Sequence, residues 1–203
     1  MRWHYTVAAH SDVGTTKAVN QDSLTVKVAN TMNGEAAFAV ICDGMGGLEQ
    51  GEVASTAVVR AYEQWFLREL PQLLARGFSE KQLEQVWMRL ANDCNVRIAD
   101  YSREQKAPMG TTLTAMLLLE GRYYISHVGD CRVYVMGNGM EQLTADQTYV
   151  AREVALGHMT PEQAQTDARR NVLLQSIGTV NCVKPDFLMG DFYDDDTFLV
   201  CSD

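Results

Sequence analysis

Apolar and polar residues follow a pattern that divides the chain into strands, then helices, then strands again. The Asn33-Gly34 pair, between two apolar runs, is typical of a tight hairpin turn. The predicted strands are Tyr5–His10, Ser23–Ala29, Ala36–Cys42, Thr112–Leu119, Tyr123–Val128, Arg132–Met136 and Thr197–Cys201.

Two long helices are predicted in the middle of the chain. The first carries apolar residues at helical spacing over Ala54–Trp65 and is expected to end before Pro71. The second is expected to begin at Ser79, which has capping-box spacing to Gln82, and it carries an apolar stripe over Leu83–Ile98. Strands, two adjacent helices and further strands in this order indicate an α+β fold of antiparallel sheets with helices packed outside them.

The segment Leu143–Asn171 is more polar than its surroundings. Pro161, directly after Thr160, predicts the start of a short helix there. Because no linker, repeat or low-complexity tract interrupts the chain, residues 1–203 are interpreted as one domain. The polar segment, at about 143–171, is then an excursion from the sheet.

The composition fits this interpretation and limits the possible partners. The sequence has 203 residues, of which 46% are hydrophobic, and its net charge is −9. A domain of this size buries roughly 70% of the surface of its unfolded chain. An acidic surface repels nucleic acid and anionic membranes, so we expect neither as a partner.

The cysteines and the N-terminus indicate the compartment. The five cysteines are odd in number and widely spaced, and the sequence has no Cys-x-x-Cys pair, which argues against a zinc knuckle or a disulfide framework. The N-terminus lacks the apolar core of a signal peptide, and no apolar run is long enough to span a bilayer. We therefore expect a cytoplasmic protein.

Four aspartates lie beside predicted strands: Asp22 opens a strand, Asp43 and Asp203 follow strands, and Asp130 lies in a turn between two. If strand ends from distant parts of the chain meet at one rim, their carboxylates repel one another unless cations neutralise them. Oxygen ligands favour Mg²⁺ or Mn²⁺. The four histidines show no zinc-ligand spacing and are interpreted as surface or packing residues. Asp43-Gly44 alone is weak evidence, because Asp-Gly after a strand is commonly a turn.

Seven motifs in order resemble those of the metal-dependent protein serine/threonine phosphatases, the type 2C or PPM family, in its bacterial form. They extend over essentially the whole chain. The matching segments are Ser11–Asp22, Ile41–Gly47 followed by Gly51–Ser55, Met109–Leu113, Val128–Arg132, Leu143–Asp146, Arg170–Gly178 and Cys201–Asp203.

The resemblance implies a four-layer α-β-β-α sandwich, with two antiparallel sheets flanked by helices and two divalent ions at one end of the sheets. It implies that Asp43 bridges the ions with a hydroxide and that the Gly44 carbonyl helps to bind one of them. Asp22 would belong to the first ion's site and Asp203 to the second's, and Asp130 matches a position linked to a third, weaker ion. The segment at about 143–171 would be the flap beside the site.

The implied activity is the hydrolysis of phosphoserine and phosphothreonine in proteins, in signalling, with Mn²⁺ or Mg²⁺ as the cofactor. Two such ions acidify a shared water and stabilise the phosphoryl oxygens during in-line displacement. No cysteine lies in the Cys-(x)5-Arg loop of cysteine-based phosphatases, which disfavours a thiolate mechanism. The oligomeric state is left open.

Two residues differ from the pattern of most members. Lys17 stands where an arginine usually grips the phosphate, and a lysine offers a point charge without a bidentate fork. Met45 stands where many eukaryotic members have a histidine proposed as a general acid. Methionine cannot donate a proton, so a metal-bound water must protonate the leaving group, or the substrate's own acidity must suffice.

The family continues past Ser202-Asp203 with further strands and one more metal-binding aspartate. We therefore expect this sequence to be a fragment without the final strands, with a weakened second metal site and loss of activity. Two alternatives stay open: a non-catalytic pseudophosphatase that binds phosphoproteins as a regulatory module, and a metal-dependent hydrolase of another phosphoester.

Overall fold

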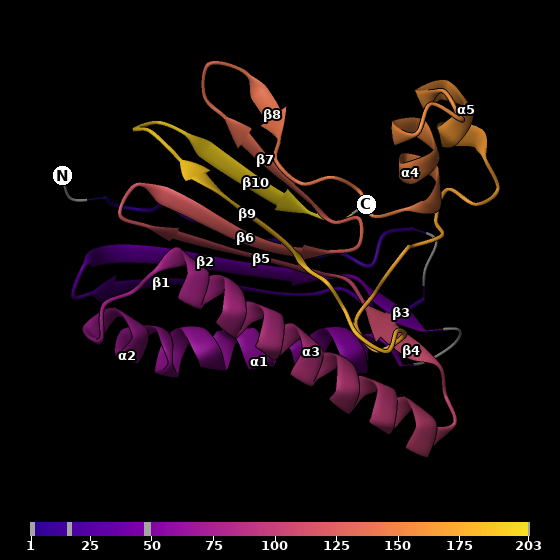
Figure 1. The fold of residues 1–203 in the computed structure, drawn as a ribbon, viewed down its shortest axis with the longest axis horizontal. Coiled ribbons are helices and arrows are strands. Elements are labelled where there is room, and N and C mark those ends of the chain that lie inside the picture. The colour runs from indigo at the N-terminus through magenta and orange to yellow at the C-terminus, as the bar shows by residue number, and fades with distance from the viewer. Residues whose placement is uncertain (1–2, 16–17, 47–49, 203) are drawn as a thin grey trace.

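The computed structural model describes residues 3–15, 18–46 and 50–202 (Figure 1). The strands in these residues are β1 (Ser23–Thr31), β2 (Gly34–Cys42), β3 (Gly44–Gly46), β4 (Met109–Thr111), β5 (Leu113–Leu119), β6 (Arg122–Val128), β7 (Arg132–Met136), β8 (Met140–Gln142), β9 (Asp186–Asp191) and β10 (Thr197–Cys201). The helices are α1 (Gly51–Arg68), α2 (Leu70–Ala75), α3 (Glu80–Gln105), α4 (Tyr149–Ala155) and α5 (Pro161–Thr166).

The strands form two facing antiparallel sheets and a small two-stranded one. The larger sheet has the order β1-β2-β5-β6-β9, the second has the order β10-β7-β8, and β3 pairs with β4. Figure 1 shows α1 and α3 along the face of the five-stranded sheet that is turned away from the second sheet. The antiparallel sheets with flanking helices confirm the predicted α+β class.

The main core fills the space between the five-stranded sheet and the helices. Phe38 on β2 stacks on Phe66 of α1, with ring centroids 4.9 Å apart, and also meets Trp65 and Trp87. All four rings are at most 2% exposed. The stripes predicted on the two helices therefore form this core, as their helical spacing requires.

A second core lies between the two sheets. It contains Met116 and Leu118 of β5 and Val133 of β7. The neighbouring residues Leu117 and Leu119 point to the helical side instead. Successive side chains of a strand face opposite ways, and both faces of β5 are covered, so β5 is apolar except for the buried Thr114.

The helix boundaries follow local signals that the sequence contains. The Ser79 side chain accepts a hydrogen bond from the Gln82 amide, which caps α3 as expected. α1 ends at Arg68, before Pro71, but the chain resumes at once as α2, with this proline at its first turn. This short second helix was not predicted, because Pro71 was interpreted only as the end of a helix. Proline is excluded from a helix interior but is tolerated at a helix start, so a new helix can begin here.

The predicted strand Tyr5–His10 is wrong: these residues form no strand. Of these residues only Tyr5 is partly buried, against the core between the sheets, and its amide donates to the Glu35 carboxylate over 2.6 Å. Residues 6–10 are exposed, so the alternating pattern here does not reflect a covered face.

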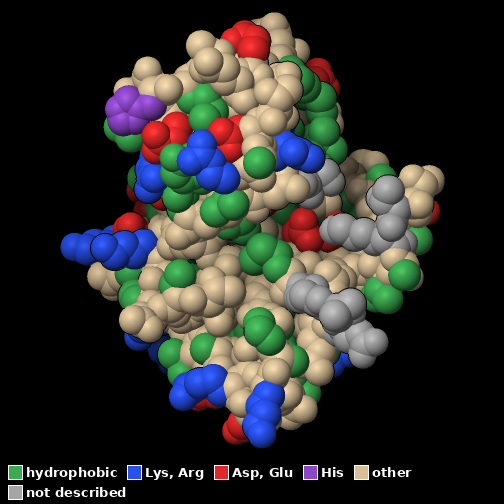
Figure 2. Space-filling view, turned by 90° about the vertical axis from the view of Figure 1, so that its right-hand side faces the viewer, with side chains coloured by type: hydrophobic (Ala, Val, Ile, Leu, Met, Phe, Trp, Pro, Cys, Tyr) green, Lys and Arg blue, Asp and Glu red, His purple; other side chains and the backbone are tan. Residues whose placement is uncertain are grey.

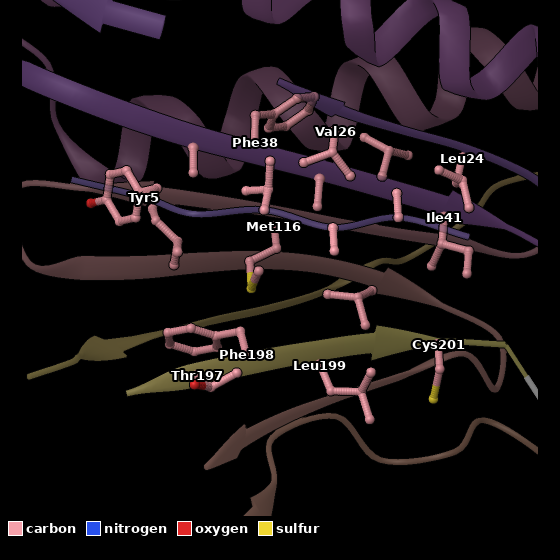
Figure 3. A pocket seen from close by; sticks show the side chains of 18 of the residues that line it. Tyr5, Leu24, Val26, Phe38, Ile41, Met116, Thr197, Phe198, Leu199 and Cys201 are labelled. Atoms are coloured by element: carbon pink, nitrogen blue, oxygen red, sulfur yellow. The ribbon is translucent and has the colours of Figure 1, made fainter. Parts of the chain in front are cut away.

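A groove of about 700 Å³ separates the N-terminal segment and the face of β1 and β2 from β10. Figure 3 shows Leu24, Val26 and Ile41 on one side of it and Phe198 and Leu199 on the other. Among the described residues β10 pairs only with β7, so its other edge borders this groove. The C-terminal end of β10 lies close to Asp22, to which Ser202 donates a hydrogen bond.

We predict that Phe38→Ala lowers the free energy of unfolding by about 3–5 kcal/mol, because it leaves a cavity among three large rings. Leu67→Ala is the control, since Leu67 on α1 is 55% exposed. It is expected to change stability by less than about 0.5 kcal/mol. Urea denaturation checks both, and equal losses for the two variants would contradict the described core.

Candidate metal centre

Asp22 lies at the junction between the first motif and β1, and its loop is held by side chains. The Asn20 amide nitrogen donates to Ser11 Oγ over 2.7 Å, and Asn20 Oδ1 accepts the Asp22 amide over 3.0 Å. Ser202, just after β10, donates to Asp22 Oδ2 over 2.8 Å. Two segments that are 180 positions apart in sequence therefore meet at this half-buried carboxylate.

Asp43 and Gly44 do not form the turn that Asp-Gly commonly makes; Gly44 begins the short strand β3. The Gly44 amide donates to the Gln21 carbonyl over 3.1 Å, and Ser55 Oγ of α1 donates to the same oxygen over 2.7 Å. A Cβ on Gly44 would overlap the backbone oxygens of Gly51 and Gln21. Only glycine fits here, so the Asp43 segment can lie directly against the Asp22 segment.

Asp130 lies in the turn between β6 and β7. The preceding Gly129 has φ +112°, which favours glycine. Its amide donates to Gln147 Oε1 over 2.9 Å, and its carbonyl accepts the Gln147 amide over 2.8 Å. The turn that carries Asp130 is thus tied to the base of the polar excursion.

Hydrogen bonds bring the three aspartate segments into one region: the Gly44 amide reaches the Gln21 carbonyl, and Thr112 Oγ1 lies 2.8 Å from the Asp43 amide and 3.1 Å from Cys131 Sγ. Burial raises the pKa of this thiol to about 12, and the negative charges of Asp43, Asp130 and Asp22 add to the effect. Figure 2 shows this end of the molecule, with acidic side chains at the surface near its middle. Carboxylates from three remote positions therefore gather around one buried thiol.

Carboxylate oxygens are the hard donors that Mg²⁺ and Mn²⁺ prefer, so the donor chemistry of this region fits such ions. Within residues 3–15, 18–46 and 50–202, however, no group of three or more His, Cys, Asp or Glu side chains is close enough together to hold an ion by itself. Two predicted site residues, Lys17 and Asp203, lie outside the described residues. The metal ligands stay a prediction.

The histidines agree with their interpretation as surface or packing residues. His127 is fully buried, and its ring nitrogens lie 2.9 Å from Thr114 Oγ1 and 3.1 Å from the Ala145 carbonyl. Burial lowers its pKa below the ordinary value of 6.5. His4, His10 and His158 are exposed.

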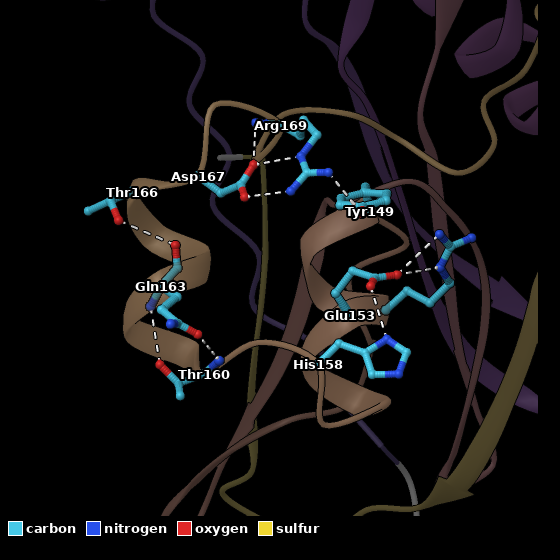
Figure 4. Close-up of polar contacts among 9 residues, drawn as sticks. Tyr149, Glu153, His158, Thr160, Gln163, Thr166, Asp167 and Arg169 are labelled. Atoms are coloured by element: carbon cyan, nitrogen blue, oxygen red, sulfur yellow. Dashed lines mark hydrogen bonds and ion pairs between the residues drawn. The ribbon is translucent and has the colours of Figure 1, made fainter.

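The polar excursion contains α4 and α5 and is held by its own contacts (Figure 4). Thr160 and Gln163 form a reciprocal capping box at the start of α5, as Pro161 suggested. Arg169 donates to both oxygens of Asp167 over 2.9 Å, and its guanidinium lies 4.3 Å from the Tyr149 ring centroid. These contacts give the segment its own compact form beside the Asp130 turn.

Residues 10–202 match the family model described as Protein phosphatase 2C. The chain belongs to the protein phosphatase 2C family. It is 33% identical over 170 residues to the serine/threonine phosphatase stp of Listeria innocua, an alignment that covers 82% of this chain and 65% of the relative. The chain thus spans slightly less than two thirds of the length of that relative.

Solved structures of protein phosphatase 2C proteins share this fold. The serine/threonine phosphatase of S. agalactiae has a TM-score of 0.80 and 26% identity, over 93% of this chain and 75% of that one. The catalytic domain of the phosphatase PstP, solved in complex with two manganese ions, has a TM-score of 0.75 and 30% identity, over 96% of this chain and 76% of that one.

None of the helices in the described part of the chain has the length and apolar character of a membrane-spanning helix.

Sequence reasoning did not assign a role to several residues that hold the aspartates of this protein phosphatase 2C chain. Thr111 Oγ1 donates to the Asp43 carbonyl over 2.9 Å, and Thr112 Oγ1 accepts the Asp43 amide over 2.8 Å. Ser202 reaches Asp22, as described above. These residues lie in or beside the quoted motifs, but their polar partners are remote in sequence, so a local pattern could not assign them.

We predict that Gly51→Ala destabilises the protein by about 1–3 kcal/mol, although alanine favours a helix over glycine. The new Cβ would lie 2.8 Å from the Gly44 carbonyl carbon and 2.9 Å from the Gln21 side chain. Gly139→Ala is the matched control, because nothing lies within 4 Å of its added Cβ. Thermal unfolding compares the two, and a harmless Gly51→Ala would contradict the close backbone contact.

The lowered pKa of His127 predicts a pH dependence of stability. The unfolded state binds a proton below about pH 6.5, whereas the folded state resists it. The free energy of unfolding should therefore fall as the pH drops from about 6.5 toward the folded-state pKa of His127. Above about pH 6.5 this group should cause no loss. Denaturation from pH 7 to 5 with His127→Gln as the comparison tests this; an equally steep decline in the variant would exclude His127 as the cause.

Proposed function

We propose that this chain is the core of a metal-dependent phosphatase that hydrolyses phosphoserine and phosphothreonine in proteins. The observation that carries the proposal is the gathering of Asp22, Asp43 and Asp130 at one end of the facing sheets, around the buried Cys131. Like charges brought together from remote positions are stabilised by cations. The named activity of the protein phosphatase 2C relatives supports the same conclusion.

The proposed cofactor is a pair of Mn²⁺ or Mg²⁺ ions, with a third, weaker site at Asp130. The two manganese ions bound by PstP support this assignment. Asp43 with the Gly44 carbonyl, Asp22, and Asp203 are the proposed ligands. Since Asp22 already accepts a hydrogen bond from Ser202 on one oxygen, its other oxygen is the better placed donor to an ion.

Two bound cations would supply a hydroxide that bridges them and would neutralise the charge of the phosphoryl group. The protein's own task is then to hold the carboxylates close together and to orient the substrate. Lys17 is proposed to attract the phosphate as a point charge. Met45, which lies on β3, cannot donate a proton, so the leaving group would take its proton from a metal-bound water, or its own acidity would suffice.

The proposed substrates are phosphorylated proteins in the cytoplasm. The flap-like excursion at about 143–171, tied to the Asp130 turn through Gln147, is proposed to influence which substrates are accepted. Neither nucleic acid nor a membrane is a proposed partner, because the net charge is −9.

We predict that Asp43→Asn lowers Mn²⁺-dependent hydrolysis of an aryl phosphate at least about 100-fold, because it removes the charge that would bridge the cations. Activity is expected in the longest natural form that contains this chain, and the 203-residue chain, for which loss of activity is expected, is assayed beside it. Asp194→Asn, at an exposed loop position, is the matched control and should leave turnover unchanged. Chelator should abolish activity.

Two results would contradict the proposal in different ways. Turnover that persists in chelator would exclude a metal-dependent mechanism. A folded longest form that binds Mn²⁺ and phosphoprotein without turnover would favour the alternative, a non-catalytic phosphoprotein-binding module.

A further inference from the structure

Asp43 lies opposite Thr112 at a break in an otherwise continuous pair of strands. The pairing of β2 with β5 and that of β3 with β4 have one common register, and only the residues around Asp43 and Thr112 fall between them. The break is therefore a local feature of this one position and not a change of alignment. It coincides with the residue proposed to bridge the cations.

The Thr112 side chain replaces a backbone group at this break. In a regular hydrogen-bonded antiparallel pair, each residue donates its amide to the other's carbonyl. Here the Thr112 amide donates to the Asp43 carbonyl over 2.9 Å, but the Asp43 amide donates to Thr112 Oγ1 over 2.8 Å. The position of the Asp43 main chain thus depends on a hydroxyl that only serine or threonine could supply.

The same side chain also contacts the turn that carries Asp130. Thr112 Oγ1 lies 3.1 Å from Cys131 Sγ, within hydrogen-bonding distance. A Cβ on Gly129 would lie 2.5 Å from Thr112 Cγ2, so the methyl group occupies the space that this glycine leaves. Thr112 is 1% exposed and connects two of the segments that carry the proposed ligands.

We propose that Thr112 is a positioning residue that sets the geometry of Asp43 for cation binding through its hydroxyl. This rests on the function proposed above. The hydroxyl fixes the Asp43 amide away from a regular ladder geometry, and residues that support metal ligands in this way commonly contribute 10–100-fold to metal affinity. Thr112 itself touches neither substrate nor cation.

A merely structural role would make Thr112 equivalent to any other buried, hydrogen-bonded threonine of the sheet. Thr114 is the matched control: it lies two residues further along the chain, in β5, is fully buried, and its Oγ1 lies 2.9 Å from His127 Nδ1. Thr112→Val and Thr114→Val each remove one buried hydroxyl while keeping the shape of the side chain. Only the first removes a partner of Asp43.

The experiment measures Mn²⁺ affinity by calorimetry and stability by denaturation for both valine variants and for Thr112→Ser. We expect Thr112→Val to weaken Mn²⁺ binding about 10–100-fold. Thr114→Val should lose stability but bind Mn²⁺ within about threefold of the wild type. Thr112→Ser, which keeps the oxygen, should also bind Mn²⁺ within about threefold of the wild type. If Thr112→Val does not fold, the affinity of Thr112→Ser still tests the proposal.

A second, metal-free measurement follows hydrogen exchange of the Asp43 amide. Exchange should accelerate at least about tenfold in Thr112→Val relative to both the wild type and Thr114→Val, because the amide loses its acceptor. The proposal is overturned if Thr112→Val binds Mn²⁺ as the wild type does, if Thr114→Val weakens binding equally, if Thr112→Ser fails to restore it, or if exchange is unchanged. A wild type that binds no Mn²⁺ would contradict the proposed function instead, while the exchange measurement would still decide whether Thr112 holds Asp43.

Discussion

The Gln21 carbonyl is the contact on which the arrangement of the candidate site depends. It accepts hydrogen bonds from the Gly44 amide and from Ser55 Oγ, and so joins the start of β1, the end of β2 and the first turns of α1. Asp22 and Asp43, one on each side of this junction, carry like charges that repel each other, more strongly where water is excluded. The backbone contacts must supply the free energy that keeps these carboxylates together when no cation is bound.

Much of the fold could be predicted because its signals are local. The apolar stripes of α1 and α3 and the mostly apolar run of β5 reflect burial that a short window of sequence reveals. Asn33-Gly34 likewise predicted the hairpin of β1 and β2, although its turn is Met32-Asn33 and Gly34 already begins β2. The aspartates could be found for the same reason, since each lies next to a strand end. Their gathering around Cys131 followed from the expectation that strand ends of packed sheets share a rim.

What could not be predicted depends on partners that are remote in sequence. β9 pairs with β6, more than fifty positions earlier, and its own burial is only partial, so it has no clear apolar pattern. Tyr5–His10 has a strand-like pattern but lines the groove beside the sheet instead of joining a sheet edge. Gly44–Gly46 is a strand and not a turn, because β4 pairs with it. In each case a non-local contact decided between two conformations that the local pattern allowed equally.

The two best-placed aspartates are held in different ways, and this has consequences for the chemistry. The Asp22 amide is bonded to Asn20 Oδ1 and its carboxylate accepts a hydrogen bond from Ser202, so a change at this serine would alter the orientation of the acid group alone. Asp43 is held through its main chain by Thr111 and Thr112, so a change there would move the whole residue and the adjoining Gly44 carbonyl with it. A bridging ligand must keep its distance to two ions at once. If its backbone is displaced, rotation of the side chain cannot restore both distances. Two neighbouring threonines thus fix the backbone of the residue proposed to bridge.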